Sequence, residues 1–138
     1  MVNRALDSSV DCGTPDKPVL CVVDDDRSVR VALSGLLRAI GFDVNTYASG
    51  AEFMLSGVAR QCHGLIADIQ MKGMTGFELQ QALEAASIAL PIVFISGHAD
   101  EAMRERALAA GAVALLAKPF SESALLDAVR AALARGGP

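Results

Sequence analysis

Four short apolar segments of this sequence lead into residues that could take part in phosphoryl chemistry. The residues are the acidic cluster Asp24-Asp25-Asp26, then Asp68, Ser96 and Lys118. In a parallel sheet the carboxyl ends of the strands lie at one edge, so these groups can converge in one pocket. Clustered carboxylates repel one another unless a proton or a cation joins them, and oxygen ligands favour Mg²⁺. The spacing therefore indicates a divalent metal and a phosphoryl group.

Each of these side chains fits a role in such a pocket. Asp68 can act as the nucleophile, because aspartyl phosphates are a known type of covalent intermediate. Ser96 can donate a hydrogen bond to a phosphoryl oxygen, and Lys118 can pair with another as a point charge. No Gly-rich phosphate loop is present, which favours a phosphate donor other than bound ATP. Taken singly, each residue also has a plainer interpretation as a helix cap, a turn or a strand exit, and only their joint placement favours the pocket.

The elements that must position these residues alternate between strand and helix patterns. We expect strands over residues 19–24, 42–47, 64–68, 91–96 and 112–117, each followed by an amphipathic helix. Helix starts are indicated by Asp26, Ser49, Thr75 and Ser121, the second and third with a capping-box pattern, and Gly41 and Gly111 mark helix ends. Five such units predict an α/β fold of the flavodoxin-like (βα)5 type, a doubly wound parallel sheet in the order 2-1-3-4-5. Residues 1–17 are expected to be a flexible leader, 18–134 the domain and 135–138 a tail.

Composition narrows the class of protein. Hydrophobic residues make up 52% of the 138, charged residues 20%, and the net charge is −4 without a basic cluster, which argues against nucleic-acid binding by this chain. No apolar stretch is long enough to span a bilayer. The three cysteines have no metal-type spacing and suit a cytoplasmic protein, with Cys21 a small core residue. His63 and His98 are expected in loops, the methionines in packing, and Arg104 and Arg106 on the exposed side of a helix.

The sequence resembles the receiver domain of bacterial two-component response regulators, over about residues 18–134. Four motifs carry the resemblance: Val22-Val23-Asp24-Asp25-Asp26, Ala67-Asp68-Ile69-Gln70-Met71, Ile95-Ser96-Gly97-His98 and Ala117-Lys118-Pro119-Phe120. The Ser-Gly-His and Lys-Pro-Phe patterns in the last two are most similar to those of receivers of the FixJ type.

The resemblance implies a phosphate-accepting Asp68, with Ser96 and Lys118 completing the catalytic set. It implies Mg²⁺ held by Asp24, Asp25, Asp68 and the backbone carbonyl of Gln70, with Asp25 a direct ligand. It also implies a sensor histidine kinase as donor, an unknown downstream protein, and a signalling domain rather than an enzyme with turnover. The face made by the fourth helix, fifth strand and fifth helix is, by the same resemblance, a candidate output or homodimer surface.

Two positions depart from the family pattern. An aromatic residue usually stands three before the Lys, where this sequence has Leu115, and a Pro usually follows the position of Met71, where it has Lys72. Leu115 keeps open a second hypothesis, a phosphate-independent interaction module. A third, a Mg²⁺-dependent phosphohydrolase, is disfavoured because Gln70 stands where an acid/base Asp would be needed. The sequence is compatible both with a stand-alone receiver and with a piece of a longer regulator.

Overall fold

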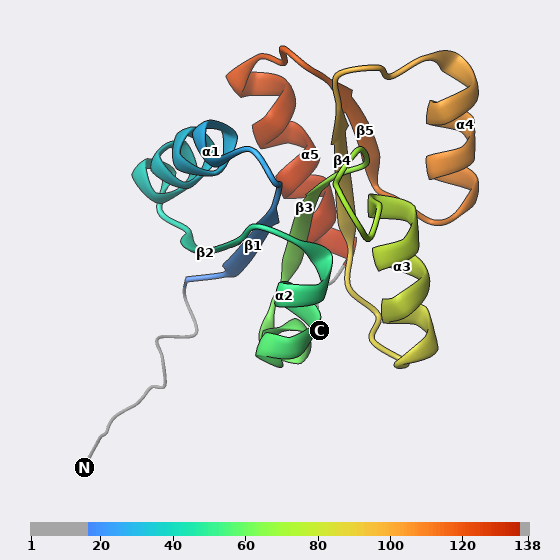
Figure 1. Ribbon diagram of the computed structural model, residues 1–138. Helices are drawn as coiled ribbons and strands as arrows, with labels where there is room; N and C mark the ends of the chain where they lie inside the picture. The colour runs from blue at the N-terminus through green and yellow to red at the C-terminus, as the bar shows by residue number, and fades with distance from the viewer. Residues whose placement is uncertain (1–16, 136–138) are drawn as a thin grey trace.

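A computed structural model describes residues 17–135 and contains one parallel sheet of five strands in the order β2-β1-β3-β4-β5 (Figure 1). The strands are β1 (Val19–Val23), β2 (Asp43–Tyr47), β3 (Gly64–Asp68), β4 (Ile92–Ser96) and β5 (Ala114–Ala117). The helices are α1 (Arg27–Ile40), α2 (Gly50–Ser56), α3 (Gly76–Ala85), α4 (Glu101–Ala109) and α5 (Glu122–Arg135), with a short 3₁₀ helix, η1 (Val58–Gln61), after α2. The predicted fold class and strand order are confirmed.

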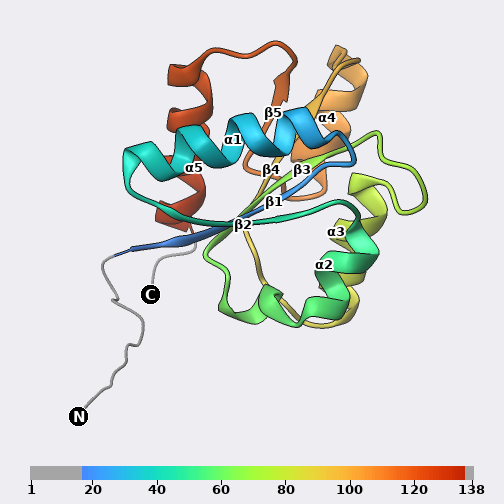
Figure 2. The ribbon, with the colours of Figure 1, turned by 60° about the vertical axis from the view of Figure 1, so that its left-hand side comes forward.

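Each face of the sheet has its own apolar core. On one face, Leu33 and Leu37 of α1 and Leu125 and Val129 of α5 pack on side chains of the central strands. On the other face, α2, α3 and α4 bury a second cluster that includes Phe53, Leu79, Phe94 and Ala107. Figure 2 shows α1 and α5 on one side of the sheet, with α2 and α3 on the other. Because the central strands are covered on both faces, β3 and β4 are buried at every residue.

The predicted helix starts hold in detail, with one exception. Asp26 caps α1 by accepting from the N–H of Ser28, and Thr75 forms the full capping box with Glu78. Ser49 caps α2, but the Glu52 carboxylate accepts from the N–H of Ala48 rather than from that of the cap residue. The capping box predicted at Ser49 is therefore only half formed, and the one predicted at Thr75 is complete.

The strand β3 has its predicted range, and the other four strands differ from theirs by one or two residues at one end. The structure begins β5 at Ala114 rather than at residue 112, because the N–H of Ala112 still bonds the carbonyl of Ala107 at the end of α4. The helix η1 was not predicted. The expected leader lies almost entirely outside the described residues, as does most of the expected tail. Within residues 17–135, no helix has the length and apolar character needed to cross a bilayer.

Candidate functional site

The carboxyl ends of the strands bring the predicted polar residues to one edge of the sheet. Asp68 and Ser96 are the last residues of β3 and β4, while Asp24 and Lys118 directly follow β1 and β5. Sheet-type hydrogen bonds continue past these ends, since the N–H of Asp24 bonds the carbonyl of Tyr47 at 3.1 Å and that of Lys118 bonds Ser96 at 2.8 Å. The rigid sheet, rather than a loop, therefore positions these side chains.

Three carboxylates form a compact group. Asp24, Asp25 and Asp68 each place an oxygen within 4.8 Å of the other two. Asp24 is fully buried and Asp68 is 5% exposed, whereas Asp25 lies at the surface. Backbone N–H groups donate to the two buried carboxylates, that of Asp26 to Asp24 at 2.9 Å and that of Gln70 to Asp68 at 3.0 Å. Such a group of oxygen donors, partly open to solvent, suits a hard divalent cation.

Lys118 supplies the positive charge that faces this group. Its Nζ lies 3.0 Å from Oδ2 of Asp68 and 3.3 Å from Oδ2 of Asp24. Burial works to lower the pKa of the Lys118 ammonium, but the hydrogen bond to Asp68 and the charge of Asp24 outweigh it, and the pKa is raised. Lys118 therefore stays charged and bridges the two buried carboxylates.

The charged form of Asp24 is disfavoured in the folded protein even though Lys118 lies beside it. Burial raises the pKa of the Asp24 carboxyl, and the charge of Asp68 raises it further. The N–H of Asp26 and the Lys118 ammonium oppose the shift without cancelling it. A single ammonium thus does not balance the carboxylates, which is the condition under which a bound cation stabilises a site.

The hydroxyl of Ser96 is already engaged in this structure. It donates to Oε1 of Gln70 at 2.7 Å and accepts from the N–H of His98 at 3.0 Å. Gln70 lies in the loop after β3 and His98 in the loop before α4, so Ser96 joins two loops beside Asp68. Sequence reasoning placed Gln70 here only for its backbone carbonyl and missed its side chain.

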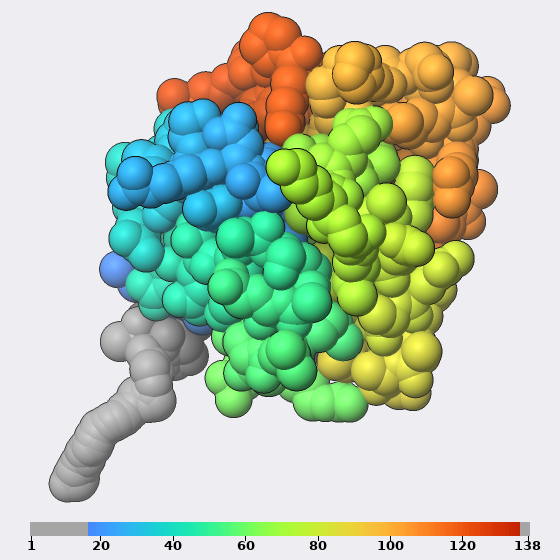
Figure 3. Space-filling view, viewed as in Figure 1, coloured from blue at the N-terminus to red at the C-terminus, as the bar shows by residue number. Residues whose placement is uncertain are grey.

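The loop after β3 closes the site from another side. The backbone N–H of Lys72 donates to Oδ2 of Asp25 at 3.1 Å. Figure 3 shows the start of α1 (blue) and this loop (light green) in contact on the molecular surface. Its Gly73 has φ +77°, a conformation that glycine adopts readily.

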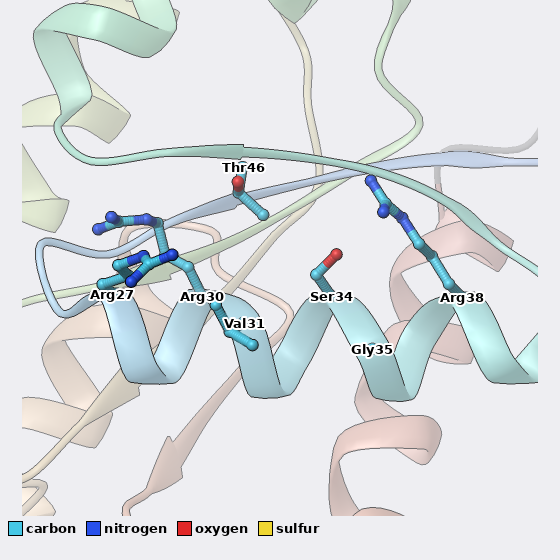
Figure 4. A pocket seen from close by; sticks show the side chains of 7 residues that line it. All are labelled: Arg27, Arg30, Val31, Ser34, Gly35, Arg38 and Thr46. Atoms are coloured by element: carbon cyan, nitrogen blue, oxygen red, sulfur yellow. The ribbon is translucent and has the colours of Figure 1, made fainter.

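A separate groove of about 480 Å³ runs between α1 and the edge strand β2 (Figure 4). Arg27 and Arg30 lie toward one end and Arg38 at the other, with the hydroxyls of Ser34 and Thr46 between them. Arg30 also connects the groove to the acidic group, since its Nη1 donates to the backbone carbonyl of Asp24 at 2.7 Å. This hydrogen bond joins α1 to the backbone at the end of β1, where Asp24 stands.

Of the two arginines of α4 that were expected on the exposed side of the helix, Arg106 is exposed, whereas Arg104 is only partly exposed. Nη1 of Arg104 donates to the backbone carbonyl of Leu115 at 2.7 Å, and the guanidinium of Arg106 lies 4.0 Å from the ring centre of Phe77. Leu115 itself is fully buried. Arg104 thus ties α4 to β5 at the residue that replaces the usual aromatic.

Comparison with known proteins is decisive for the family. The sequence model of the response regulator receiver domain matches residues 20–130. The chain belongs to this family. It is 43% identical over 115 residues to the response regulator protein TodT of Pseudomonas putida, which is 83% of this chain and 51% of that protein. It is 35% identical over 121 residues to the transcriptional regulatory protein FixJ of Azorhizobium caulinodans, or 88% of this chain and 57% of FixJ.

Solved structures agree with this assignment. The receiver superposes on the response regulator StyR with a TM-score of 0.81 at 47% identity, covering 87% of this chain and 61% of that one. It superposes on the amino-terminal part of FixJ with a TM-score of 0.77 at 32% identity, covering 86% and 94%. The chain spans about half the length of the curated relatives it matches. It is therefore a receiver domain, a signalling domain of a two-component system.

Proposed function

We propose that Asp68 of this receiver accepts a phosphoryl group from a sensor histidine kinase in a Mg²⁺-dependent reaction. The observation that carries the proposal is the meeting of Asp24, Asp25, Asp68 and Lys118 at one sheet edge. Asp68 is the central member of the group. Its carboxylate lies within 4.8 Å of those of Asp24 and Asp25, and the Lys118 ammonium is 3.0 Å from it. It is also the candidate nucleophile predicted from the sequence.

The donor set fits Mg²⁺. Asp24, Asp25 and Asp68 offer carboxylate oxygens that lie close together, and the backbone carbonyl of Gln70 is proposed as a further ligand. When bound, the ion would offset the negative charge of the phosphoryl oxygens. Burial, and then the charge of Asp68, disfavour the charged form of Asp24, and a bound cation would offset both effects.

In the proposed transfer, a carboxylate oxygen of Asp68 attacks the phosphorus of the donor. The new O–P bond forms as the P–N bond of a phosphohistidine breaks, and the imidazole keeps the electron pair of that bond. Lys118, 3.0 Å from Asp68, would then pair with a phosphoryl oxygen as well as with the carboxylate. Because the sheet holds nucleophile and ammonium in place, little reorganisation is needed at the moment of transfer.

The signal would leave the site through Ser96. To bond a phosphoryl oxygen, its hydroxyl has to give up Gln70, and any movement is transmitted to His98, whose N–H it accepts. His98 precedes α4, which Arg104 joins to β5. The face made by α4, β5 and α5 is therefore the proposed surface for a downstream protein or a second copy of the receiver.

The deciding experiment is intact-protein mass spectrometry after incubation with Mg²⁺ and acetyl phosphate. We expect one phosphoryl group on the parent protein, none on Asp68→Asn, and none on the parent when a chelator replaces Mg²⁺. Equal uptake by Asp68→Asn would place the acceptor elsewhere and overturn the assignment.

Leu115 supports a second candidate, an interaction module whose partner binding ignores phosphate. An aliphatic side chain that is already fully buried has no aromatic ring to swing inward. This alternative predicts that a partner protein isolated by its binding to the receiver has the same affinity for the receiver with and without beryllofluoride, a phosphoryl mimic. A clear difference would reject it in favour of the switch.

A further inference from the structure

Two cysteines distant in sequence meet on the sheet face that is covered by α2 and α3. Cys21 lies in β1 and Cys62 lies between η1 and β3, yet their Sγ atoms are 2.6 Å apart. Both are free thiols. Sulfur atoms in a disulfide are about 2.05 Å apart, so a bond between these two requires little movement of either side chain.

The two thiols differ in access. Cys21 is fully buried among the core residues of that face, whereas Cys62 is partly exposed and packs against the same core. A small oxidant in solution can therefore reach Cys62 first. The contact with Cys21 lowers the pKa of the Cys62 thiol despite its partial burial, while the same contact and burial raise the pKa of Cys21. Cys62, the more accessible thiol, is therefore the one at which oxidation is expected to begin.

We propose that Cys21 and Cys62 form a redox modification site, at which a peroxide converts the pair to an intramolecular disulfide joining β1 to the segment before β3. The pair is distinct from the acidic group, because Cys21 stands three residues before Asp24 in the chain and neither cysteine belongs to the cluster of Asp24, Asp25 and Asp68.

The chemistry needs one hydrogen peroxide per pair. The Cys62 thiolate attacks a peroxide oxygen, the O–O bond breaks, and the departing hydroxide takes up a proton, which leaves a sulfenic acid on Cys62. The Cys21 sulfur then attacks the Cys62 sulfur, the S–O bond breaks, and the hydroxide leaves as water with the proton of the Cys21 thiol. In balance, two thiols and one peroxide give one disulfide and two waters.

The cross-link would have a measurable effect on stability. It closes a loop that contains α1, β2, α2 and η1, so it restricts the unfolded chain far more than the folded one. We expect the oxidised receiver to unfold at higher urea concentration than the reduced one. The gain should vanish on adding dithiothreitol.

The test uses the full chain with Cys12→Ser, so that Cys21 and Cys62 are the two cysteines left in the sequence. After hydrogen peroxide we expect the mass to fall by two hydrogens, both thiols to resist alkylation, and a tryptic peptide pair joined through Cys21 and Cys62. Dithiothreitol should reverse all three. Recovery of two alkylatable thiols from the folded, peroxide-treated protein would overturn the proposal.

Two variants in the same background identify the roles. Cys62→Ser, at the partly exposed position, should leave Cys21 unmodified by peroxide. Cys21→Ala should leave Cys62 to gain oxygen and to react with dimedone, which traps sulfenic acids. Oxidation of Cys21 in the first variant, or an inert Cys62 in a folded second variant, would contradict the proposed order of events.

Discussion

At the scale of single residues, the hydroxyl of Ser96 is the group whose partner must change. Its hydrogen bond to Gln70 holds the unphosphorylated arrangement, and the same hydroxyl is the proposed donor to a phosphoryl group. Gln70 therefore competes with the phosphoryl group for Ser96. A neutral hydrogen bond contributes about 0.5–1.5 kcal/mol net, so its loss should shift the balance by roughly 2–10-fold.

We therefore expect Gln70→Ala to raise the ratio of phosphorylated to unphosphorylated protein at steady state by that factor, with Mg²⁺ and acetyl phosphate. The backbone carbonyl proposed as a metal ligand is retained in this variant. Intact-protein mass spectrometry measures the fraction. Gln61→Ala, an exposed change in η1, is the matched control and should behave as the parent. A lower fraction in Gln70→Ala would show that its side chain assists phosphorylation instead.

The sequence allowed the strand-end residues to be predicted, and not their side-chain partners. The positions of Asp24, Asp68 and Ser96 could be predicted because each residue directly follows or ends an apolar run that forms a strand. Ser96 with Gln70 and Cys21 with Cys62 are contacts 26 and 41 residues apart in the chain. They depend on how a loop or a short 3₁₀ helix turns, which no local period encodes.

At the scale of elements, helix starts were predictable because each depends on one side chain and a nearby N–H. Thr75 with Glu78 is a contact within a single turn, so the motif alone specifies it. Glu52 departs from its motif because the N–H of Ala48, just before the cap residue, is the donor that it reaches. His63 was rightly expected outside an element, but its Nδ1 accepts from the N–H of Val19, a tie between β1 and the start of β3.

The start of α3 packs directly against the backbone beside the acceptor. A Cβ added to Gly76 would lie 2.8 Å from the carbonyl oxygen of Asp68 and 2.9 Å from Cα of Ile69. Backbone would have to move, so Gly76→Ala should destabilise the receiver by about 1–3 kcal/mol and slow phosphoryl uptake at Asp68.

Gly35 is the matched control for this substitution. It lies exposed within α1, and nothing is within 4 Å of an added Cβ. Gly35→Ala should be neutral or stabilise by up to about 1 kcal/mol, because alanine favours the helix. Urea unfolding of both variants measures the difference. Similar free energies of unfolding for the two would contradict the close packing of α3 on the acceptor strand.

At the scale of the whole molecule, the cluster of Asp24, Asp25 and Asp68 is expected to lower the free energy of unfolding when no metal is bound. Its carboxylates repel one another across the edge of a sheet whose two cores are otherwise well packed. Mg²⁺ that binds only the folded state should stabilise it by about 2.7 kcal/mol at 100 times its dissociation constant. The metal should therefore raise the midpoint of unfolding, and a chelator should reverse the effect.

Asp24→Asn tests the same balance without metal. The folded-state pKa of Asp24 is raised above its ordinary value of 3.8, so between the two values the folded state holds more protons than the unfolded one. The free energy of unfolding contributed by Asp24 thus falls as pH rises through that window, and the loss persists at neutral pH. Asn retains an oxygen for the N–H of Asp26 and removes the charge, so the variant should be more stable than the parent at pH 7 in chelator.

That advantage should shrink as the pH falls from the raised pKa of Asp24 toward 3.8, and it should be lost below 3.8, where the parent carboxyl is neutral in both states. Mg²⁺ should stabilise the parent and much less the variant. Asp26→Asn is the control, because Asn also caps helices and the hydrogen bonds from Ser28 lower the pKa of Asp26 rather than raise it. Urea unfolding at both pH values, with Mg²⁺ or chelator, measures all three proteins. If Asp24→Asn were less stable than the parent in chelator at pH 7, the ion pair with Lys118 would outweigh the repulsion, and the acidic group would stabilise the fold without a metal.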